Sequence, residues 1–387
     1  MSTAIDKRPH IVIATTAFAP FVGGAEIAVQ ELIVRLHAQF RFTIITARLD
    51  VALLRRDEWR GVQIIRVGWG TPLDKLWLIF AFSWHVARLR RIGGVQLVWA
   101  IMASYAGAAA CMAQMITRAP YVLTLQEGDN LENIERRVQP LSFFFRQIFS
   151  RARGIQVIAP FLSEWATKLG AHVQPVIIPN GVSCELFATT VEKKMQFRAE
   201  VRNELLIPEN ASTILSISRL VEKNGISDLI SAMEQLPEHH LILVGDGILR
   251  DSLEVQSHSI KGRVHFLGTQ HQHDLSRFAA AADIFCRPAH SEGLGIVFLE
   301  ALCMQLPVVA TRVGGIPSII TDEQEGLLVS PGNISELVSA LRRVTEDLVL
   351  YKQMQTKGLE RVAQFSWELF APKISAWLFD ALKKWDY

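Results

Sequence analysis

Short apolar runs alternate with longer segments of helical periodicity along almost the whole chain. Near-continuous runs of β-branched and aliphatic residues indicate strands buried on both faces, which is typical of parallel sheets covered by helices. The alternation of the two element types therefore predicts doubly wound α/β structure. A first series of strand-like runs occupies 10–16, 42–47, 62–67, 96–100, 121–126, 155–159 and 176–180, and a second occupies 213–218, 240–245, 264–268, 283–288, 307–311 and 326–329.

The alternation pauses between the two series, where Pro, Asn and Gly precede a charged amphipathic stretch. We therefore predict one Rossmann-like domain at 1–187 and a second at 188–364, a division that suits a chain of 387 residues. Residues 333–387 show helical periodicity and no further strand-like run. Ligands of such sheets bind beyond the carboxyl ends of the strands, so we expect a cleft between the strand ends of the two domains.

One segment has the length of a membrane span, because no charged residue occurs from Ile92 to Thr117. Its first part, "VQLVWA", has the pattern of a short buried strand. Its second part, "SYAGAAACMAQMI", is rich in Ala and Gly and has the pattern of a tightly packed helix. A buried strand followed by a helix is the preferred interpretation, and a spanning helix is the alternative.

Composition excludes some classes of protein. The formal net charge of +2 gives no electrostatic reason to expect nucleic acid as a partner. The four cysteines are scattered and form no CxxC pair, so we expect neither a disulfide framework nor a zinc site. The polar start "MSTAIDKRPH" does not have the pattern of a signal peptide. These features favour a cytoplasmic protein, and contact with the inner face of the cytoplasmic membrane is a further hypothesis.

The densest chemical signal is "SEGLGIVFLEA" (291–301), a glycine turn directly before a predicted helix. Free backbone N–H groups at a helix start attract phosphate, and glycine allows close approach. A diphosphate is therefore expected at Gly293, Leu294, Gly295, Ile296 and Val297. Glu300 then lies about one and a half turns into the helix, where it can accept hydrogen bonds from ribose, and Glu292 faces the other end of the ligand. The alternative is an ordinary capped helix with Glu300 on its solvated face.

Other candidate residues also follow predicted strands. Arg219 and Lys223 lie in the loop after the first strand of the second domain, where two cations could meet a diphosphate, although a merely solvated loop is the alternative. In the first domain, Gly23 and Gly24 form a turn before a helix. Three polar residues end another strand and are candidates for acceptor contacts or for capping: Gln126, Glu127 and Asp129.

These residues stand in motifs that resemble glycosyltransferase family 4, the glycosyl transferases group 1, over nearly the whole chain. The motifs are "GGAE" (23–26), "IPNGV" (178–182), "SRLVEKNG" (218–225), "VGDG" (244–247), "HFLG" (265–268), "AAADIFCRPAHSEGLGIVFLEA" (280–301) and "PVVATRVGGIP" (307–317). The resemblance implies a GT-B fold of two facing Rossmann-like domains, with the segment 365–387 packing back on the first domain as a helix. It also implies a retaining glycosyltransferase of the hexosyl-transferring kind.

The same resemblance assigns roles to residues. Glu292 and Glu300 correspond to the family's E-x7-E pair, with Glu300 on the donor ribose and Glu292 beside the transferred sugar. Arg219 and Lys223 would neutralise the leaving diphosphate, and Gly24 would abut the diphosphate and sugar. The loop from Gly268 to Gln270 would border the base. The co-substrate would be a UDP- or GDP-sugar, with no separate cofactor.

The sequence departs from the family pattern at two informative positions. Asn224 stands where the family usually has lysine before the glycine, so Lys223 comes one residue earlier, and Gln126 stands where many members have histidine. Glutamine can donate and accept hydrogen bonds but cannot act as an acid or base. The chain also contains no D-x-D pair, so no metal site is expected and the diphosphate charge falls to Arg219, Lys223 and the helix start.

Two segments of the first domain combine aromatic and basic residues. They are 73–91, with Trp77, Phe80, Phe82 and Trp84, and 136–154, with Phe143 to Phe145 and Phe149, each among several arginines. Such mixtures suit an interfacial helix on anionic lipid, and they also suit aromatic residues packed under a sheet beside solvated arginines. We accordingly expect a glycan or lipid-linked acceptor, in cell-surface polysaccharide or glycolipid synthesis, with peripheral membrane association as a hypothesis.

Three other functions remain as alternatives to sugar transfer. A glycoside hydrolase could use the two glutamates as its acid and its base or nucleophile, but it leaves the glycine turn and the arginine loop unexplained. A non-catalytic sugar-nucleotide-binding subunit is favoured by Gln126 and Asn224. A dinucleotide-dependent dehydrogenase is remote, because no complete GxGxxG follows the first strand.

Overall fold

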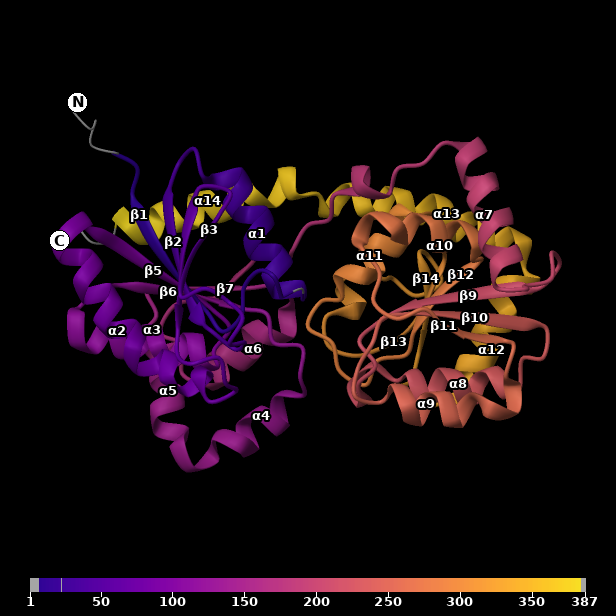
Figure 1. Cartoon of the computed structure of the whole chain (residues 1–387), viewed down its shortest axis with the longest axis horizontal. Helices are drawn as coiled ribbons and strands as arrows, with labels where there is room; N and C mark the ends of the chain where they lie inside the picture. The colour runs from indigo at the N-terminus through magenta and orange to yellow at the C-terminus, as the bar shows by residue number, and fades with distance from the viewer. Residues whose placement is uncertain (1–6, 22, 384–387) are drawn as a thin grey trace. The chain divides into compact units, whose positions relative to one another are not determined.

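The computed structural model describes residues 7–21 and 23–383, which group into two compact units. The first unit takes in the chain up to Glu127, Leu131–Asn180 and the chain from Trp367 onward, and the second takes in Gly128–Asn130 and Gly181–Ser366. The sequence boundaries proposed above fall at 187/188 and 364/365. Each unit contains one sheet with helices on both of its faces (Figure 1).

The sheet of the first unit has eight strands in the order β3-β4-β2-β1-β5-β6-β7-β8. Every pair of neighbours is parallel except β3 and β4. The central strands are apolar and buried throughout, as sheets covered on both faces require. The strands are β1 His10–Thr15, β2 Arg41–Ala47, β3 Arg56–Trp59, β4 Val62–Val67, β5 Val95–Ile101, β6 Tyr121–Leu125, β7 Gly154–Val157 and β8 Val176–Ile177.

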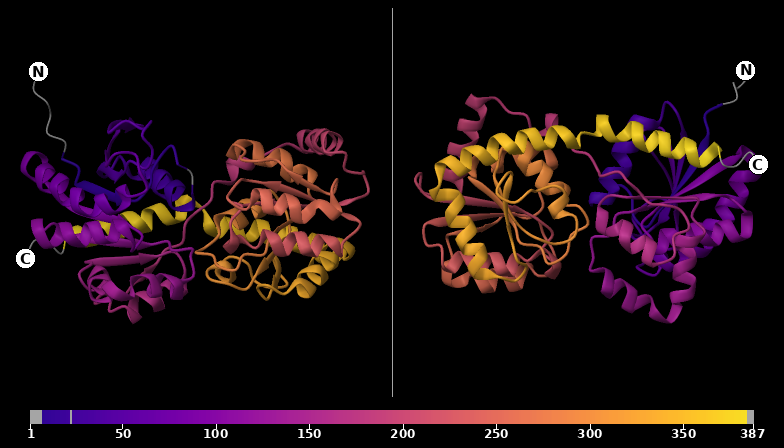
Figure 2. Two further views of the ribbon diagram at one scale, coloured as in Figure 1. Left: turned by 60° about the horizontal axis from the view of Figure 1, so that its bottom comes forward. Right: turned by 180° about the vertical axis from the view of Figure 1, so that it is seen from behind.

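The last described helix, α14 (Trp367–Lys383), belongs to the first unit. It packs against α1 (Gly24–Leu36), where Arg35 and Glu368 form an ion pair of 3.0 Å. The ribbon of α14 is drawn in yellow in Figure 2. The segment predicted to pack on the first domain, 365–387, thus has α14 in the first unit, and its residues 384–387 lie outside the described residues. The other helices of this unit are α2 Asp74–Gly93, α3 Tyr105–Thr117, α4 Leu131–Val138, the 3-10 turn η1 Gln139–Leu141, α5 Ser142–Ser150 and α6 Pro160–Lys168.

The strand pattern missed one element, the antiparallel edge strand β3. Its sequence "RDEW" is charged and largely exposed, so it carries no apolar run. The turn that joins it to β4 consists of Arg60 and Gly61, both with positive φ (49° and 81°). A two-residue loop with positive φ at both positions is the usual hairpin turn, so the Arg-Gly pair was the available signal.

The sheet of the second unit is fully parallel, with six strands in the order β11-β10-β9-β12-β13-β14. In chain order this is 3-2-1-4-5-6, the arrangement of dinucleotide-binding sheets. The order reverses between β9 and β12, which lie side by side. The strands are β9 Ser212–Ile217, β10 His239–Val244, β11 Val264–Phe266, β12 Ile284–Arg287, β13 Val308–Thr311 and β14 Gly326–Val329.

A continuous apolar core fills the space between this sheet and helices α8, α9, α12 and α13, and includes Ile214, Leu229, Leu241 and Leu341, all fully buried. The helices of the unit are α7 Val191–Glu204, α8 Ile226–Glu234, α9 Arg250–Gln256, α10 Leu275–Ala281, α11 Ile296–Cys303, α12 Ile334–Glu346 and α13 Leu348–Val362. The short 3-10 turns are η2 Cys184–Phe187, η3 Glu222–Asn224, η4 Ser257–Ile260, η5 Gln272–Asp274, η6 Ile316–Ser318 and η7 Ala363–Phe365.

The uncharged segment Ile92–Thr117 contains the buried strand β5 followed by α3, as the preferred interpretation predicted. α3 packs against α2 and β5, and its small residues, including Ala106, Ala109 and Ala110, are fully buried. Over residues 7–21 and 23–383, no helix is both long enough and apolar enough to cross a membrane.

The aromatic residues of the two basic segments divide into buried and exposed groups. Phe82 of α2 is fully buried, and Phe145 and Phe149 of α5 pack on Trp165. These residues belong to the core of the first unit, so the two segments are not aromatic surfaces throughout. The exposed aromatic residues are Trp77, Phe80, Trp84, Phe143 and Phe144.

The expectation that the cysteines form no disulfide is wrong, because Cys184 and Cys303 are bonded to each other. Their Cα atoms lie 5.2 Å apart, although 119 positions separate them in sequence. The bond joins η2 to the end of α11, two elements that come together only in the folded unit. A pairing of this kind leaves no local spacing pattern for sequence reasoning to detect.

Candidate functional site

The candidate donor residues lie at the carboxyl ends of β9 and β12, the neighbouring central strands of the second unit. β9 and β12 pair with Leu215 opposite Phe285. The loop after β9 carries Arg219, and the loop after β12 carries Glu292. Because the strand order reverses between these two strands, their loops diverge to opposite sides and leave a crevice where ligands of such sheets bind.

The predicted glycine turn does lead into a helix, α11, which begins at Ile296. Gly295 precedes it with φ of +87°, a conformation that side chains rarely adopt. The N–H groups of the first turn of α11 have no partner four residues earlier in a helix, and the helix dipole is positive at this end. The turn therefore leads into a helix start as the sequence predicted, and diphosphate binding there stays a prediction.

A second glycine turn, Gly314–Gly315 after β13, packs against the backbone of Glu292. Gly314 has φ of +52°, and a Cβ atom there would lie 1.8 Å from the carbonyl oxygen of Glu292. The next residue, Gly315, donates its N–H to the same carbonyl oxygen at 3.3 Å. The "GGIPS" segment thus fixes the backbone at Glu292, which explains why glycines are needed after β13.

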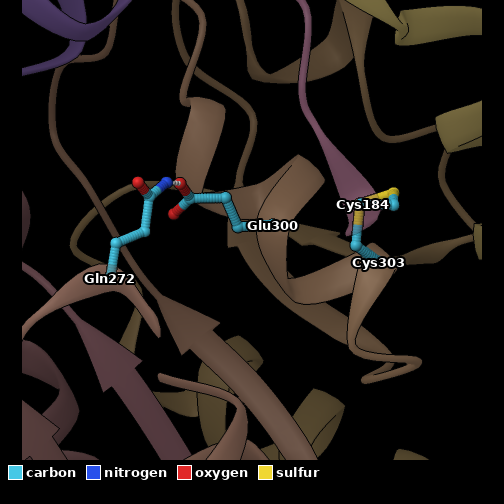
Figure 3. The surroundings of a disulfide bond; sticks show 4 residues. All are labelled: Cys184, Gln272, Glu300 and Cys303. Carbon is cyan, nitrogen blue, oxygen red and sulfur yellow. Dashed lines mark hydrogen bonds between the residues drawn. A yellow bond between two sulfur atoms is a disulfide. The ribbon is translucent and has the colours of Figure 1, made fainter. Parts of the chain in front are cut away.

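Glu300 is the fifth residue of α11 and is only 8% exposed, which contradicts a solvated position for this side chain. One of its carboxylate oxygens accepts a hydrogen bond of 2.9 Å from Nε2 of Gln272, in η5 (Figure 3). Burial raises the pKa of the Glu300 carboxyl, while the Gln272 hydrogen bond and the charge of Arg287 oppose that rise. Gln272 was missed by the sequence analysis, since a glutamine in a polar loop carries no distinguishing pattern.

Glu292 is held by an arginine that the sequence analysis also missed. Arg287 ends β12, and its guanidinium donates to the Glu292 carboxylate and lies 4.9 Å from the centre of the Phe298 ring. Burial lowers the pKa of Arg287 to about 10, and the positive charge of Arg219 acts in the same direction. The one available signal was an arginine directly after the apolar residues "IFC" (284–286) of a predicted strand.

The two glutamates therefore share one buried cation. Arg287 forms an ion pair with Glu292 directly, and its charge also acts on Glu300. A buried charge needs a partner, because desolvation otherwise disfavours it strongly. Such an arrangement fixes Glu292 in one orientation beside the start of α11, where its Oε1 accepts the Gly293 N–H at 2.8 Å.

The two residues of the arginine loop that differ from the family pattern have distinct surroundings. Asn224 is buried and donates its side-chain amide to the carbonyl oxygen of Arg219 at 2.8 Å, so it shapes the loop. The Lys223 ammonium donates to the carbonyl oxygen of Gly128 at 2.9 Å and to Asp129 at 2.8 Å. These five residues, Arg219 among them, all belong to the second unit. The Arg219 side chain is exposed.

The loop expected to border the base begins at Gly268, directly after β11. Gly245, at the end of β10, donates its N–H to the Gly268 carbonyl oxygen at 2.8 Å. The side chain of Gln270 donates back to the carbonyl oxygen of Leu267 at 2.7 Å, which leaves this turn closed on itself. The Gln270 side chain is thus used within the turn, while Thr269, between Gly268 and Gln270, is exposed. Contact of this loop with a base stays a prediction.

The first unit contains the other predicted features, the glycine turn before α1 and the polar residues that follow β6. Gly23 precedes α1, which begins at Gly24. Gln126 is 8% exposed and accepts a hydrogen bond of 3.0 Å from Asn180, and Glu127 accepts one of 2.6 Å from the N–H of Ala103. Both side chains are thus engaged with their own unit. Whether either also meets an acceptor stays a prediction.

Two family descriptions match this sequence. "Glycosyl transferase 4-like domain" matches residues 23–181, and "Glycosyl transferases group 1" matches residues 197–361, the range that contains all the candidate donor residues of the second unit.

The chain belongs to the glycosyl transferases group 1 family.

The relatives of this group 1 chain are named for different glycan products. The chain is 30% identical, over 70% of its own length and 66% of the relative's, to the putative teichuronic acid biosynthesis glycosyltransferase TuaC of Bacillus subtilis. It is also 30% identical, over 55% of its length and 58% of the relative's, to a GDP-mannose-dependent monoacylated alpha-(1-6)-phosphatidylinositol monomannoside mannosyltransferase of Corynebacterium glutamicum. The matches span about one third to two thirds of the length of the first curated relatives.

Solved structures of glycosyltransferases share the fold of this chain. The sucrose-phosphate synthase of Thermosynechococcus elongatus has a TM-score of 0.81 at 22% identity, over 98% of this chain and all of the other. HepE of Anabaena, solved with UDP and glucose, has a TM-score of 0.79 at 20% identity, over 96% of this chain and all of the other. The fold of this group 1 chain is GT-B, as the sequence resemblance implied.

Proposed function

We propose that the chain is a retaining, metal-independent glycosyltransferase. It moves a sugar from a UDP- or GDP-sugar to a glycan or lipid-linked acceptor in the synthesis of cell-surface polysaccharide or glycolipid. The observation that carries the proposal is the position of the two glutamates. Glu292 and Glu300 lie on either side of an anion-binding helix start, with the buried guanidinium of Arg287 paired to the first and acting electrostatically on the second.

The site chemistry divides the donor among named groups. The N–H groups of residues 294–297 and the cations Arg219 and Lys223 bind the diphosphate, whose negative charge grows as the sugar leaves. Glu300 accepts hydrogen bonds from the ribose hydroxyls, since its partner Gln272 occupies only one of its oxygens in the described residues. Glu292 lies by the sugar, where a carboxylate stabilises positive charge that develops at the anomeric carbon.

Two relatives support the choice of donor class. HepE was solved with UDP-glucose, and the corynebacterial mannosyltransferase is GDP-mannose-dependent. Both are nucleoside-diphosphate sugars, and the Gln270 side chain in the loop after Gly268 is already hydrogen-bonded to Leu267 rather than directed at a base. A panel of UDP-, GDP- and ADP-sugars is therefore the appropriate set of substrates for a first assay.

Metal independence rests on the cations that the chain itself supplies. The sequence has no D-x-D pair, while Arg219, Lys223 and the helix start can neutralise the leaving diphosphate. Transfer should therefore proceed at the same rate in Mg²⁺ and in excess EDTA. A fall of more than tenfold in EDTA would contradict this part of the proposal.

Membrane association rests on one face of α2. Trp77, Phe80 and Trp84 are 43–59% exposed and follow one another at helical spacing of three or four, with exposed Leu76 next to Trp77. The stripe continues into the exposed basic residues Arg88 and Arg91. Aromatic and basic residues on one helix face suit the boundary of an anionic bilayer. Flotation with anionic vesicles tests this, and absence of binding at low salt would contradict it.

The decisive assay is sugar transfer by paired variants. Glu300→Ala should weaken nucleotide binding about tenfold or more, because hydrogen bonds to a charged group are lost. Glu292→Ala should mainly lower kcat. Glu346→Ala, which removes an exposed glutamate on α12, is the matched control and should behave as wild type. If both site variants transfer sugar at the wild-type rate, the proposal is wrong.

A non-catalytic nucleotide-sugar-binding subunit is the second candidate. Gln126 favours it, since its amide is neither an acid nor a base and is already hydrogen-bonded to Asn180. This function predicts tight binding of a nucleotide sugar with no turnover against any acceptor. Measurable donor hydrolysis or transfer that Glu292→Ala abolishes would exclude it.

A further inference from the structure

The disulfide Cys184–Cys303 differs from the other cysteines in exposure. Both bonded residues are half-buried, so solvent reaches their surroundings, whereas Cys111 and Cys286 are buried free thiols. Burial raises the pKa of each buried thiol, which keeps it protonated and poorly reactive. Only the bonded pair is thus placed to react with a reductant in solution.

The bond also lies beside the elements that hold Glu300. Cys303 is the last residue of α11, three positions after Glu300, and Cys184 opens η2. η2 packs against α11 and also against η5, the turn that carries Gln272 (Figure 3). η2 therefore contacts both α11, which carries Glu300, and η5, which carries its hydrogen-bond partner Gln272. The disulfide bonds η2 covalently to α11.

We propose that Cys184 and Cys303 form a thiol–disulfide exchange site that controls the affinity of the second unit for nucleoside diphosphates. While the bond is intact, η2 is tied to α11, and η5 is supported in the position from which Gln272 orients the Glu300 carboxylate. When the bond is broken, η2 is released, and part of the binding free energy must be spent in ordering these elements. The inference rests on the proposed role of Glu300 at the donor ribose.

The exchange reaction needs a dithiol as its co-reactant. A thiolate of the dithiol attacks one sulfur of the Cys184–Cys303 bond, which forms a mixed disulfide and releases the other cysteine as a thiolate that takes up a proton. The second thiol of the reductant then displaces the remaining cysteine. Two electrons pass to the protein, two cysteine thiols are formed, and the dithiol becomes a cyclic disulfide.

The test measures affinity in both redox states of the full chain. UDP, GDP and ADP are titrated by calorimetry against the oxidised protein and against protein reduced with dithiothreitol, with the redox state of Cys184 and Cys303 checked by mass spectrometry. We expect the Kd of the best-bound nucleotide to rise about fivefold on reduction, the lower end of typical coupling between sites. Cys184→Ser should show the weaker affinity in both conditions, and Cys111→Ser should respond like wild type.

A second measurement separates this inference from the proposed function. Hydrogen exchange of the nucleotide-free protein should become faster in α11 and η5 on reduction, whether or not a nucleotide binds. Absence of binding by all three nucleotides in both states would refute the donor role of Glu300, and with it the control of affinity. Unchanged Kd, unchanged exchange in fully reduced protein, or failure of the bond to form under oxidised glutathione would each overturn the inference.

Discussion

The two units use the ends of their central strands differently. In the second unit, charged side chains converge there and are buried together: Arg287 is paired with Glu292 and also acts on Glu300. In the first unit, the corresponding polar residues are Gln126 and Glu127, which are hydrogen-bonded within their own unit. Exposed aromatic residues of the first unit lie instead on helix surfaces, Trp77, Phe80 and Trp84 on α2 and Phe143 and Phe144 on α5.

The proposed function accounts for this difference. A diphosphate and a ribose always present the same charges and hydroxyls, so one fixed set of buried charges can serve them. Acceptors vary, and contacts to them can be spread over surface helices and loops. We therefore expect substitutions at strand ends to be far more damaging in the second unit than in the first.

The largest effect is expected at Glu292. Glu292→Gln should lower kcat about 10²–10³-fold, as loss of a group that stabilises transition-state charge does, while the Kd for the nucleotide changes little. The matched change in the first unit, Gln126→Ala, should lower kcat less than tenfold. Steady-state kinetics with the best donor checks both. Equal losses would remove the distinction between the units.

The next effect is expected at Arg287. Arg287→Met leaves the Glu292 carboxylate half-buried without its partner and should destabilise the second unit by about 3 kcal/mol, as broken buried ion pairs do. If Arg287 acts through Glu292, adding Glu292→Gln should recover part of that stability and cause no further loss of kcat. Urea unfolding and kinetics of the two single variants and the double variant measure this coupling. Strict additivity in both measurements would contradict it.

The sequence predicts those features that produce a pattern within one stretch of the chain, and it does not predict contacts between distant stretches. The parallel strands are buried on both faces and appear as apolar runs, whereas the charged edge strand β3 does not. The glycine turn and Glu300 were found because their spacing along one chain segment reflects a local geometry. Arg287, Gln272 and the Cys184–Cys303 pair act across separate segments, and only the folded unit brings them together.

A smaller effect is expected from the pH dependence of stability. Burial raises the pKa of Glu300 above its ordinary value of 4.5, so the folded state retains a proton that the unfolded state loses. The stability that protonated Glu300 contributes is present below pH 4.5, the ordinary pKa of the unfolded state, and is lost as the pH rises through the higher pKa of the folded state. Glu300→Gln should remove this loss and raise the melting temperature of the nucleotide-free protein at pH 7 by roughly 2 °C or more. A lower melting temperature at pH 7 would contradict the burial argument.

The smallest effect on catalysis is expected on α2. The double change Phe80→Glu and Trp84→Glu places charge in the exposed stripe, so binding to anionic vesicles should fall at least tenfold. Transfer to a soluble acceptor should stay within twofold of wild type, because neither side chain belongs to the candidate donor site. An equal loss of transfer to soluble acceptor would place α2 in the reaction rather than at a membrane.

The most direct test of the donor site is a hydrogen-exchange footprint of the bound nucleotide. With UDP or GDP at saturation, we predict slower exchange over Gly293–Glu300 and in the loop after β9, with Glu300→Ala losing most of that protection. Protection confined to the turn at Gly23–Gly24, or to neither unit, would contradict the assignment of the diphosphate to the start of α11.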